Sequence, residues 1–264
     1  MNSETAIFKV KYGPWALIAG ASEGIGAAFS EALAGRGLKL ILIARRENLL
    51  SDLAKDIRAR HGTEVEEYAL DLSNSASVRN LISSLDKEIG LVVYNAAYSP
   101  IGYFKDVPFK DLENIITVNI QTPLLMIKRL STPMIERGKG GIILMSSLSG
   151  IQGSPKIATY AASKSFNTIL AEGLWHELRE LNVDVLACVA GAVRTPGYLT
   201  SANEKDAPGT LDPLEVVEET LETLGSAPTV TPGSFNRFAK FIMSRLLPRK
   251  RAIRIMHNNT KDLI

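Results

Sequence analysis

Residues 15–26 read WALIAGASEGIG: an apolar run, Trp15–Ala19, leads into a glycine-rich turn that opens a helical pattern. Glycines let a phosphate approach the backbone, and the N–H groups of such a turn bind a pyrophosphate together with the helix N-terminus. The spacing GxxxGxG therefore predicts a dinucleotide site, with a purely structural turn as the alternative. The predicted phosphate-binding residues are Gly20, Ser22, Glu23, Gly24, Ile25 and Gly26.

Short runs rich in Val, Ile and Leu recur beyond this turn and alternate with helical patterns. The predicted strands are Trp15–Ala19, Leu38–Ala44, Val65–Leu70, Leu91–Tyr94, Gly141–Met145 and Val183–Val189. The predicted helices are Gly26–Gly35, Glu47–Arg60, Ser75–Glu88, Phe109–Arg137 and Ala158–Leu181. The strands are apolar at nearly every position, as in a parallel sheet covered on both faces. We therefore predict an α/β fold with a doubly wound parallel sheet (Rossmann fold) in residues 1–225, and ligands at the carboxyl ends of the strands.

The C-terminal part of the chain differs in composition. A loop rich in Gly, Pro, Thr and Ser is predicted to form a lid at residues 196–213, followed by a helix over Leu214–Leu224 and a basic extension at residues 226–264. No Asp or Glu occurs from Thr223 to Lys261, so the net charge of +2 conceals a basic tail on an acidic body. Within this tail we expect a docking helix with apolar groups facing inward, Phe235, Phe238, Phe241, Ile242 and Met243, and cations facing outward, Arg237, Lys240 and Arg245.

Composition excludes several classes of protein. Hydrophobic residues make up 45% of the chain and charged residues 22%, which is incompatible with disorder over most of its length. The single cysteine, Cys188, cannot form an internal disulfide, and no apolar run approaches the roughly 18 residues that span a bilayer. Met1–Gly13 has no pattern of a secretory signal, so a cytoplasmic location is expected. No residue cluster has metal-ligand spacing, and nucleic-acid binding fits the tail poorly because its aromatic residues have helical spacing.

Two arginines after the second predicted strand bear on the choice of cofactor. Arg45 and Arg46 occupy the place where an NAD site has a carboxylate for the ribose 2′-hydroxyl. Arginines suit a 2′-phosphate, so NADP(H) is favoured over NAD(H). The alternative is a solvated helix start in which Glu47 pairs with either arginine. Asp71 and Leu72, after the third strand, are candidates for adenine contacts, with an N-cap of the next helix as the alternative for Asp71.

A candidate catalytic group follows. Tyr160 and Lys164 lie four residues apart in a predicted helix and therefore on one face. The pKa of a tyrosine is ordinarily about 10, so a proton donor working near neutrality needs cationic help, which Lys164 and a bound nicotinamide ring could supply. Ser147 ends the fifth predicted strand, and Asn119 lies in the preceding long helix. The predicted catalytic residues are Asn119, Ser147, Tyr160 and Lys164.

With these motifs the chain resembles the short-chain dehydrogenase/reductase family from Gly13 to about Thr195. The residues that carry the resemblance are Gly20, Gly24, Gly26, Asn95, Ala96, Ala97, Asn119, Ser147, Tyr160 and Lys164, with a weaker match at Gly191, Val193 and Thr195. The resemblance implies that Tyr160 is the general acid or base, that Ser147 polarises the substrate carbonyl and that Lys164 binds the nicotinamide ribose. It also implies that Asn119 holds a water in a proton relay. Asn95, Ala96, Ala97, Gly191, Val193 and Thr195 are then cofactor contacts.

The chain departs from the family pattern at four places, namely Ala19, Glu23, Tyr94 to Ala97, and Ala190-Gly191. None of these is a catalytic side chain, so the departures bear on cofactor affinity rather than on chemistry. The family implies a homodimer or homotetramer and a small carbonyl or alcohol substrate. A hydrophobic ketoacyl-like or steroid-like compound is expected, in a pocket formed by Ser149–Pro155, Tyr98, Tyr103, Tyr198 and Leu199. The alternatives are a catalytically silent NADP-binding sensor, or a protein that contacts a membrane surface or a partner through its basic tail.

Overall fold

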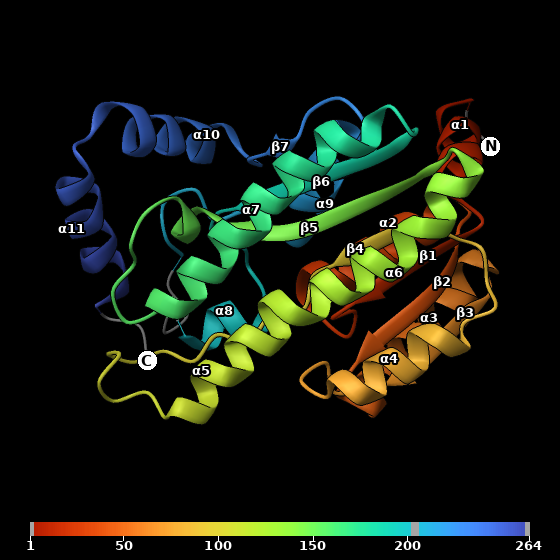
Figure 1. Cartoon of the computed structure of the whole chain (residues 1–264), viewed down its shortest axis with the longest axis horizontal. Coiled ribbons are helices and arrows are strands. Elements are labelled where there is room, and N and C mark those ends of the chain that lie inside the picture. Colours follow the sequence, from red (N-terminus) through yellow and green to blue (C-terminus); the bar gives the residue numbers. More distant parts are fainter. Residues whose placement is uncertain (1–2, 202–205, 262–264) are drawn as a thin grey trace.

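The computed structural model describes residues 3–201 and 206–261 and contains a seven-stranded sheet (Figure 1). The strand order is β3-β2-β1-β4-β5-β6-β7, and every neighbouring pair is parallel. The strands are β1 (Trp15–Ala19), β2 (Lys39–Ala44), β3 (Val65–Ala69), β4 (Ile89–Tyr94), β5 (Gly140–Ser147), β6 (Val183–Ala190) and β7 (Thr229–Val230). This doubly wound sheet confirms the predicted fold class. The order reverses between β1 and β4, where such sheets bind their ligands.

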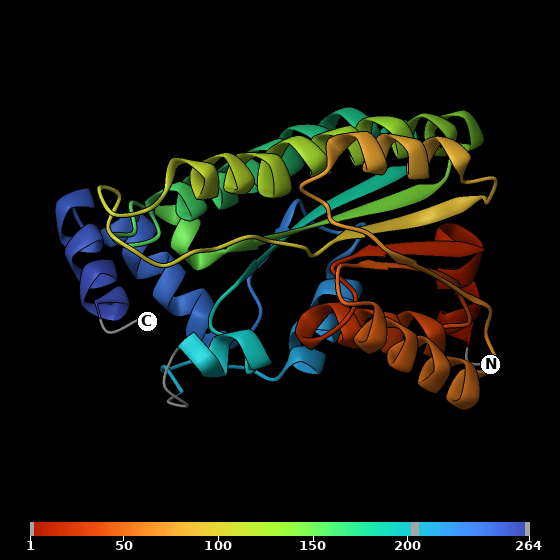
Figure 2. The same cartoon turned by 90° about the horizontal axis from the view of Figure 1, so that it is seen from below.

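Helices cover both faces of the sheet (Figure 2). One layer contains α4 (Ser75–Ser84), α6 (Thr122–Arg137) and α7 (Ala158–Arg179), and the other contains α2 (Gly24–Gly35), α3 (Glu47–His61) and α9 (Pro213–Thr223). The remaining α-helices of the described residues are α1 (Ser3–Tyr12), α5 (Phe109–Ile116), α8 (Pro196–Ser201), α10 (Ser234–Phe241) and α11 (Arg249–Thr260). Because both faces are covered, β1, β2, β4, β5 and β6 are buried along nearly their whole length, as their continuous apolar runs predicted, whereas the edge strand β3 is mostly only partly buried.

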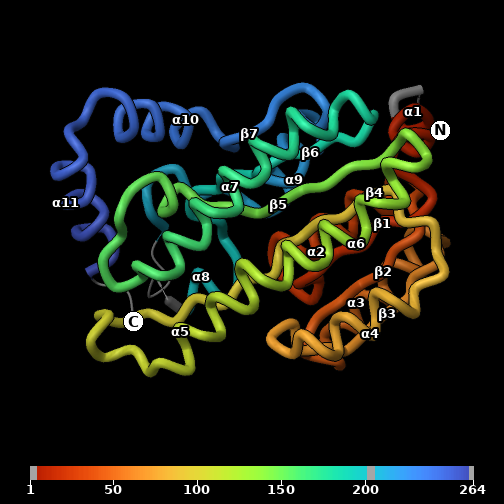
Figure 3. The backbone as a smooth tube through the Cα atoms, in the orientation of Figure 1, coloured from red at the N-terminus to blue at the C-terminus, as the bar shows by residue number. Residues whose placement is uncertain are grey.

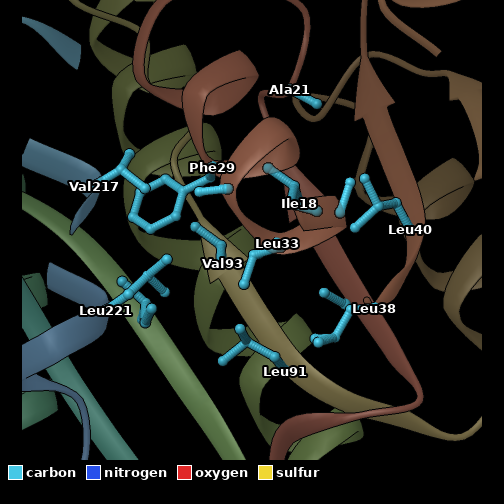
Figure 4. Close-up of a cluster of buried hydrophobic side chains, with 14 of the residues drawn as sticks. Ile18, Ala21, Phe29, Leu33, Leu38, Leu40, Leu91, Val93, Val217 and Leu221 are labelled. Carbon is cyan, nitrogen blue, oxygen red and sulfur yellow. The ribbon is translucent and has the colours of Figure 1, made fainter. Parts of the chain in front are cut away.

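The core beneath α2 and α9 holds these helices to the first strands (Figure 4). Phe29 and Leu33 of α2 pack with Val217 and Leu221 of α9 against Ile18 of β1, and four of these five side chains are fully buried. Burying a large apolar side chain contributes about 1.5 to 3 kcal/mol, so this cluster fixes the helix that follows the glycine-rich turn.

Several predicted helix boundaries were wrong. The helix expected over Ser75–Glu88 ends at Ser84, because Leu85 has an extended backbone and the chain turns there toward β4. The helix expected over Ala158–Leu181 ends at Arg179. The helix expected over Phe109–Arg137 is interrupted by a π-helix at Thr117–Gln121, which contains Asn119. The lid expected at residues 196–213 begins with helix α8, and residues 202–205 lie outside the described residues.

The C-terminal extension is built into the molecule. Its residues Thr229–Val230 form β7 beside β6, and α10 and α11 lie together at one end of the molecule (Figure 3). A seventh strand and the helix α11 were not predicted. The proposed domain boundary after residue 225 stays a prediction. Among the described helices, none has the length and apolar character needed to cross a membrane.

The orientation predicted for the tail helix was wrong for its phenylalanines and for Lys240, whereas Arg237 and Arg245 are exposed as predicted. Phe235, Phe238 and Phe241 are 51%, 64% and 52% exposed, whereas Asn236 on the opposite side is buried. The Asn236 amide donates to the carbonyl oxygens of Gly209 and Pro232, each at 3.0 Å. These polar contacts turn the phenylalanines outward, and Lys240, expected outside, is half-buried and donates to Thr231 Oγ1 at 3.2 Å.

Candidate active site

Two cavities open at the carboxyl ends of the strands. The first, of about 590 Å³, is lined by most of the residues predicted to bind the dinucleotide. These are Gly20, Ser22, Glu23, Gly24, Ile25, Arg45, Arg46, Asp71, Leu72, Asn95, Ala96, Ala97 and Thr195. The second, of about 980 Å³, is lined by Ser147, Tyr160 and Gly191. Ala97, Thr195 and Gly197 border both cavities, so a ligand in the first can meet a ligand in the second at these residues.

Each glycine of the turn is required by a close approach. A Cβ on Gly20 would lie 2.7 Å from the backbone of Ala96, and one on Gly26 would lie 1.9 Å from the carbonyl oxygen of Gly20. A Cβ on Gly24 would lie 2.7 Å from Cγ2 of Thr195. Gly20 and Gly24 also have positive φ values of 82° and 56°, which other residues rarely adopt. Gly26 supports the turn without lining the cavity.

The two arginines of the cofactor cavity have different surroundings. Arg46 forms an ion pair with Glu23 at 2.6 Å and donates to Ser22 Oγ at 3.2 Å. Neither arginine pairs with Glu47, so the predicted alternative of a helix start held by Glu47 is wrong. Arg45 lines the cavity without an ion pair to any residue of the described chain. Its charge is available to a phosphate.

The residues that follow β3 and β4 form the part of the cavity where adenine contacts were predicted. Asp71 Oδ1 accepts a hydrogen bond from the Ser73 N–H at 2.9 Å, while the N-cap of α4 is Asn74, so the N-cap alternative for Asp71 is wrong. Asn95 donates from Nδ2 to the Gly20 carbonyl oxygen at 2.8 Å and ties the end of β4 to the glycine-rich turn. Asp71 retains a carboxylate oxygen that can accept a hydrogen bond from a ligand.

Ser147 and Tyr160 both line the second cavity. Ser147 Oγ accepts a hydrogen bond from Ser149 Oγ at 3.0 Å. Burial raises the pKa of Tyr160 to about 12, and the hydrogen bond with Ser147 lowers it in part. The Tyr160 phenol therefore carries its proton at neutral pH, which is the form required of a general acid.

Lys164 lies beneath Tyr160 and does not reach either cavity surface. Its Nζ lies 5.5 Å from the centroid of the Tyr160 ring and donates to the Met145 carbonyl oxygen at 2.9 Å. Burial lowers the pKa of Lys164 to about 8. The predicted lowering of the tyrosine pKa by this ammonium is not borne out, because burial raises the pKa of the phenol and only Ser147 lowers it in part.

Asn119 occupies the π-helix and is completely buried. Its side chain binds both backbone groups of Tyr98, accepting from N at 2.8 Å and donating to O at 3.0 Å, and also donates to Ser163 Oγ at 3.0 Å. All of its side-chain groups are engaged within the protein, so Asn119 fixes the chain after Ala97. The relay water expected at Asn119 stays a prediction. π-Helices of this kind often occur at functional sites.

Some residues that line the first cavity were not predicted, and a predicted cofactor contact lines neither cavity. The first cavity is also lined by Ala44, Leu70, Ser73, Tyr98, Asn114, Val118 and Gly197. Ala44 and Leu70 could have been inferred from their places at strand ends, but Asn114 and Val118 come from a helix that carries no such signal. Val193 is buried in a bridge with Leu211 and lines neither cavity.

The second cavity combines predicted and unpredicted walls. Of the expected pocket, Ser149, Ile151, Gln152 and Tyr198 line it, whereas Tyr98 lines the first cavity and Tyr103 and Leu199 line neither. The C-terminal extension supplies a wall that was not predicted, made of Phe235, Asn236, Ala239, Lys240, Met243, Met256, Asn259 and Thr260. Half of these side chains are apolar, and Ile101, Leu148 and Ile157 add further apolar lining, so the cavity suits a hydrophobic ligand. The described residues contain no group of three or more His, Cys, Asp or Glu that could hold a metal ion.

Comparison with known proteins places these features in context. A family model described as short chain dehydrogenase matches residues 14–206, close to the region of predicted resemblance. A 7beta-hydroxysteroid dehydrogenase from Clostridium sardiniense is 34% identical over 233 residues, covering 87% of this chain and 89% of that protein.

Two solved structures are similar in sequence as well as in fold. The structure of a 7beta-hydroxysteroid dehydrogenase superposes with a TM-score of 0.88 at 30% identity, over 94% of this chain and 98% of that one. A short-chain dehydrogenase from Sphingobium yanoikuyae in complex with NADPH has a TM-score of 0.74 at 28% identity, over 83% of this chain and 87% of that one. The first match is long enough to include part of the C-terminal extension.

Proposed function

The chain belongs to the short-chain dehydrogenase family and is an oxidoreductase acting on hydroxyl and ketone groups, and we propose that it is an NADP(H)-dependent hydroxysteroid oxidoreductase. The observation that carries the proposal is that Ser147 and Tyr160 line the larger cavity together, next to the cavity lined by the glycine-rich turn. In this arrangement a carbonyl group can lie against two hydroxyl groups beside a dinucleotide.

The residues present fit a nicotinamide dinucleotide. The space beside Gly20 and Gly24 is closed to any side chain, which leaves backbone N–H groups facing the cavity for a pyrophosphate. Arg45, with Arg46, would hold the 2′-phosphate of NADP, and Asp71 would accept a hydrogen bond from adenine. The NADPH bound by the Sphingobium relative supports the same choice.

The chemistry follows from this geometry. A bound nicotinamide supplies or accepts a hydride at the substrate carbon. During reduction, negative charge grows on the carbonyl oxygen, and the hydroxyl groups of Ser147 and Tyr160 stabilise it by hydrogen bonds. Tyr160 then transfers its phenolic proton to that oxygen, a step that typically contributes about 10² to 10⁴-fold in rate. Ser147 orients the oxygen, and the Lys164 ammonium stabilises the tyrosinate that remains.

The substrate is proposed to be a hydroxysteroid or the corresponding ketosteroid. The similarity to a 7beta-hydroxysteroid dehydrogenase supports this class, and so does the apolar wall that α10 and α11 add to the cavity. A ketoacyl compound, the other class expected from the sequence, has weaker support, because a very-long-chain 3-oxoacyl-CoA reductase from Laccaria bicolor is 33% identical but matches only 67% of this chain and 54% of that protein. Oxidation and reduction use the same residues, because Tyr160 acts as base in one direction and as acid in the other.

One substitution tests the proposal. Tyr160→Phe should lower kcat for a ketosteroid at least about 10³-fold while the dissociation constant of NADPH stays within about twofold. Tyr103→Phe is the matched control, because Tyr103 loses the same hydroxyl but lines neither cavity. Unchanged turnover in Tyr160→Phe would overturn the catalytic assignment. Wild-type protein that binds NADPH but turns over no steroid or other ketone would leave the alternative of a silent NADP-binding sensor.

The oligomeric state and the cellular location of the protein are further proposals. We expect a homodimer or homotetramer, since the outward face of α5, α6 and α7 has large exposed apolar side chains, Phe109, Ile116, Leu124 and Ile169. Figure 1 shows these helices side by side on one face of the molecule. Light scattering of Leu124→Glu against wild type tests this contact. The cytoplasmic location predicted from the sequence stays a prediction.

A further inference from the structure

The outer side of the C-terminal extension carries an aromatic stripe. Phe238 and Phe241, one turn apart on α10, are 64% and 52% exposed, and Phe235 extends the stripe at 51%. Leu246, just beyond this helix, is 60% exposed. Single exposed apolar residues are normal, but four large ones within 12 residues indicate a surface that binds something. We call these four residues the aromatic stripe.

A group of exposed cations follows the phenylalanines of the stripe in the chain. Arg245, Lys250, Arg251 and Arg254 are exposed and form no ion pair with any acid of the described residues. Arg249 is also exposed and donates to the Ile151 carbonyl oxygen at 2.8 Å. No Asp or Glu occurs between residues 223 and 261, so nothing in this segment neutralises them. The segment is therefore strongly electropositive and bordered by exposed apolar groups.

We propose that the extension docks onto an anionic lipid surface, with the aromatic stripe inserted among the acyl chains and the cations on the head groups. Helices on which apolar and basic side chains alternate bind the membrane interface in this way. Each Lys or Arg near an anionic leaflet adds to the attraction, and each buried aromatic ring adds hydrophobic free energy. This function is separate from the chemistry and does not depend on the identity of the substrate.

A second copy of the chain fits this surface less well. A two-fold contact places the same patch of both subunits together, so the unpaired cations of one copy would face those of the other. Like charges at such a contact oppose association. The aromatic rings of the stripe are spaced by one helical turn, which suits lipid insertion better than stacking on successive bases of a nucleic acid.

The helix that carries most of the stripe, α10, also borders the larger cavity. The opposite side of α10 lines the larger cavity through Asn236, Ala239 and Lys240, and Phe235 itself borders it. A protein docked through this helix would therefore hold the cavity at the lipid interface. An apolar substrate dissolved in the bilayer could then enter without crossing water, which deepens the proposed function but is not needed for docking.

Vesicle co-sedimentation of the full chain tests the proposal. We expect binding to mixed phosphatidylcholine/phosphatidylglycerol vesicles, release at high salt, and little binding to phosphatidylcholine alone. Phe238→Ser/Phe241→Ser should weaken binding at least about tenfold. Lys250→Gln/Arg254→Gln should weaken it roughly 30-fold, since each base near an anionic surface contributes about 1 kcal/mol.

Val10→Ser is the control, because Val10 is 73% exposed but lies on α1, outside the stripe. It should bind vesicles as wild type does. NADPH binding and thermal unfolding of all variants establish that they are folded. Absence of vesicle binding by folded wild type overturns the proposal, as does equal binding to both vesicle types. Loss of a dimer in Phe238→Ser/Phe241→Ser by light scattering, with vesicle binding retained, would instead identify the stripe as a contact between copies.

Discussion

The guanidinium of Arg46 lies 2.6 Å from the carboxylate of Glu23, at the wall of the cofactor cavity. The ion pair joins the glycine-rich turn to the end of β2, the two segments that would enclose the phosphates. Its partner in sequence, Arg45, has no such pair within the described chain. The two arginines predicted to select NADP are therefore not equivalent, because the charge of Arg46 is already partly neutralised.

Removing the acid should release Arg46 for the 2′-phosphate. Glu23→Gln is expected to lower the dissociation constant of NADPH about two- to fivefold, since exposed ion pairs are worth at most about 1 kcal/mol. The dissociation constant of NADH should change less, because NADH has no 2′-phosphate. Fluorescence titration measures both. Glu47→Gln is the control, since Glu47 forms no ion pair with either arginine. A similar gain for both cofactors would contradict this role of Glu23.

Arg45 should be the main source of preference for NADP. Arg45→Ala is expected to raise the dissociation constant of NADPH by about 10- to 100-fold, because a charge-assisted bond to phosphate contributes about 1.5 to 3 kcal/mol. The dissociation constant of NADH should stay within about twofold. The same fluorescence titrations measure both dissociation constants. An equal loss of affinity for NADPH and NADH would mean that Arg45 maintains the shape of the cavity and does not bind the 2′-phosphate.

The contact of Gly24 with Thr195 offers a test of the turn. In Gly24→Ala, the new Cβ meets Thr195 Cγ2 at 2.7 Å, and the residue keeps a φ of 56°. We expect weaker cofactor binding and a loss of about 1 to 3 kcal/mol in the free energy of unfolding. Thr195→Ser removes Cγ2, so the double variant should recover the part of the loss due to the clash. Gly20→Ala with Thr195→Ser should recover nothing, because Gly20 is blocked by the Ala96 backbone.

The fold and most of the cofactor cavity could be predicted because local patterns determine them. Runs such as Leu38–Ala44 can only be strands of a covered parallel sheet, and the glycine spacing reflects contacts within a single turn. The π-helix around Asn119 could not be predicted. It depends on the fit of this side chain between the Tyr98 backbone and Ser163, residues that are 21 and 44 positions away in the chain.

The orientation of α10 shows a second limit of sequence patterns. Helical spacing correctly indicated that Phe238 and Phe241 share a face of the helix. It did not indicate whether that face points toward the protein interior or toward solvent. Asn236 decides that question through its bonds to the Gly209 and Pro232 carbonyl oxygens, which are tertiary contacts. The apolar face of a helix is the buried face only where the helix packs against an apolar core. One side of α10 instead borders a ligand cavity, so its apolar residues need not point inward.

Lys164 should make stability depend on pH. Its folded pKa of about 8 lies below the ordinary value of 10.5, so between these pH values the unfolded chain binds more protons. The free energy of unfolding therefore rises with pH in this window, by up to about 3 kcal/mol, and the contribution is unfavourable below about pH 8. In Lys164→Met this rise should be absent.

Urea unfolding at a series of pH values measures the effect. Subtracting the free energy of unfolding of wild type from that of Lys164→Met cancels the titration of other groups. This difference should fall steadily as the pH rises from about 8. Lys250→Met is the matched control, because Lys250 is exposed and should leave the pH dependence of wild type unchanged. A pH-independent difference would show that Lys164 binds its proton equally well in the folded and the unfolded protein, so that burial does not lower its pKa.

The wall contributed by the extension should control substrate size. Met243 follows α10 and Met256 lies on α11, and both line the larger cavity. Met243→Ala/Met256→Ala enlarges the cavity and removes apolar contacts, so KM for a ketosteroid should rise roughly tenfold or more while kcat changes little. For bulkier ketones, KM should rise less than for the ketosteroid or should fall. Leu246→Ala, on the outer side of the same segment, should change neither constant in lipid-free solution. A fall in kcat with KM unchanged would mean instead that the wall positions the reacting carbonyl against Tyr160.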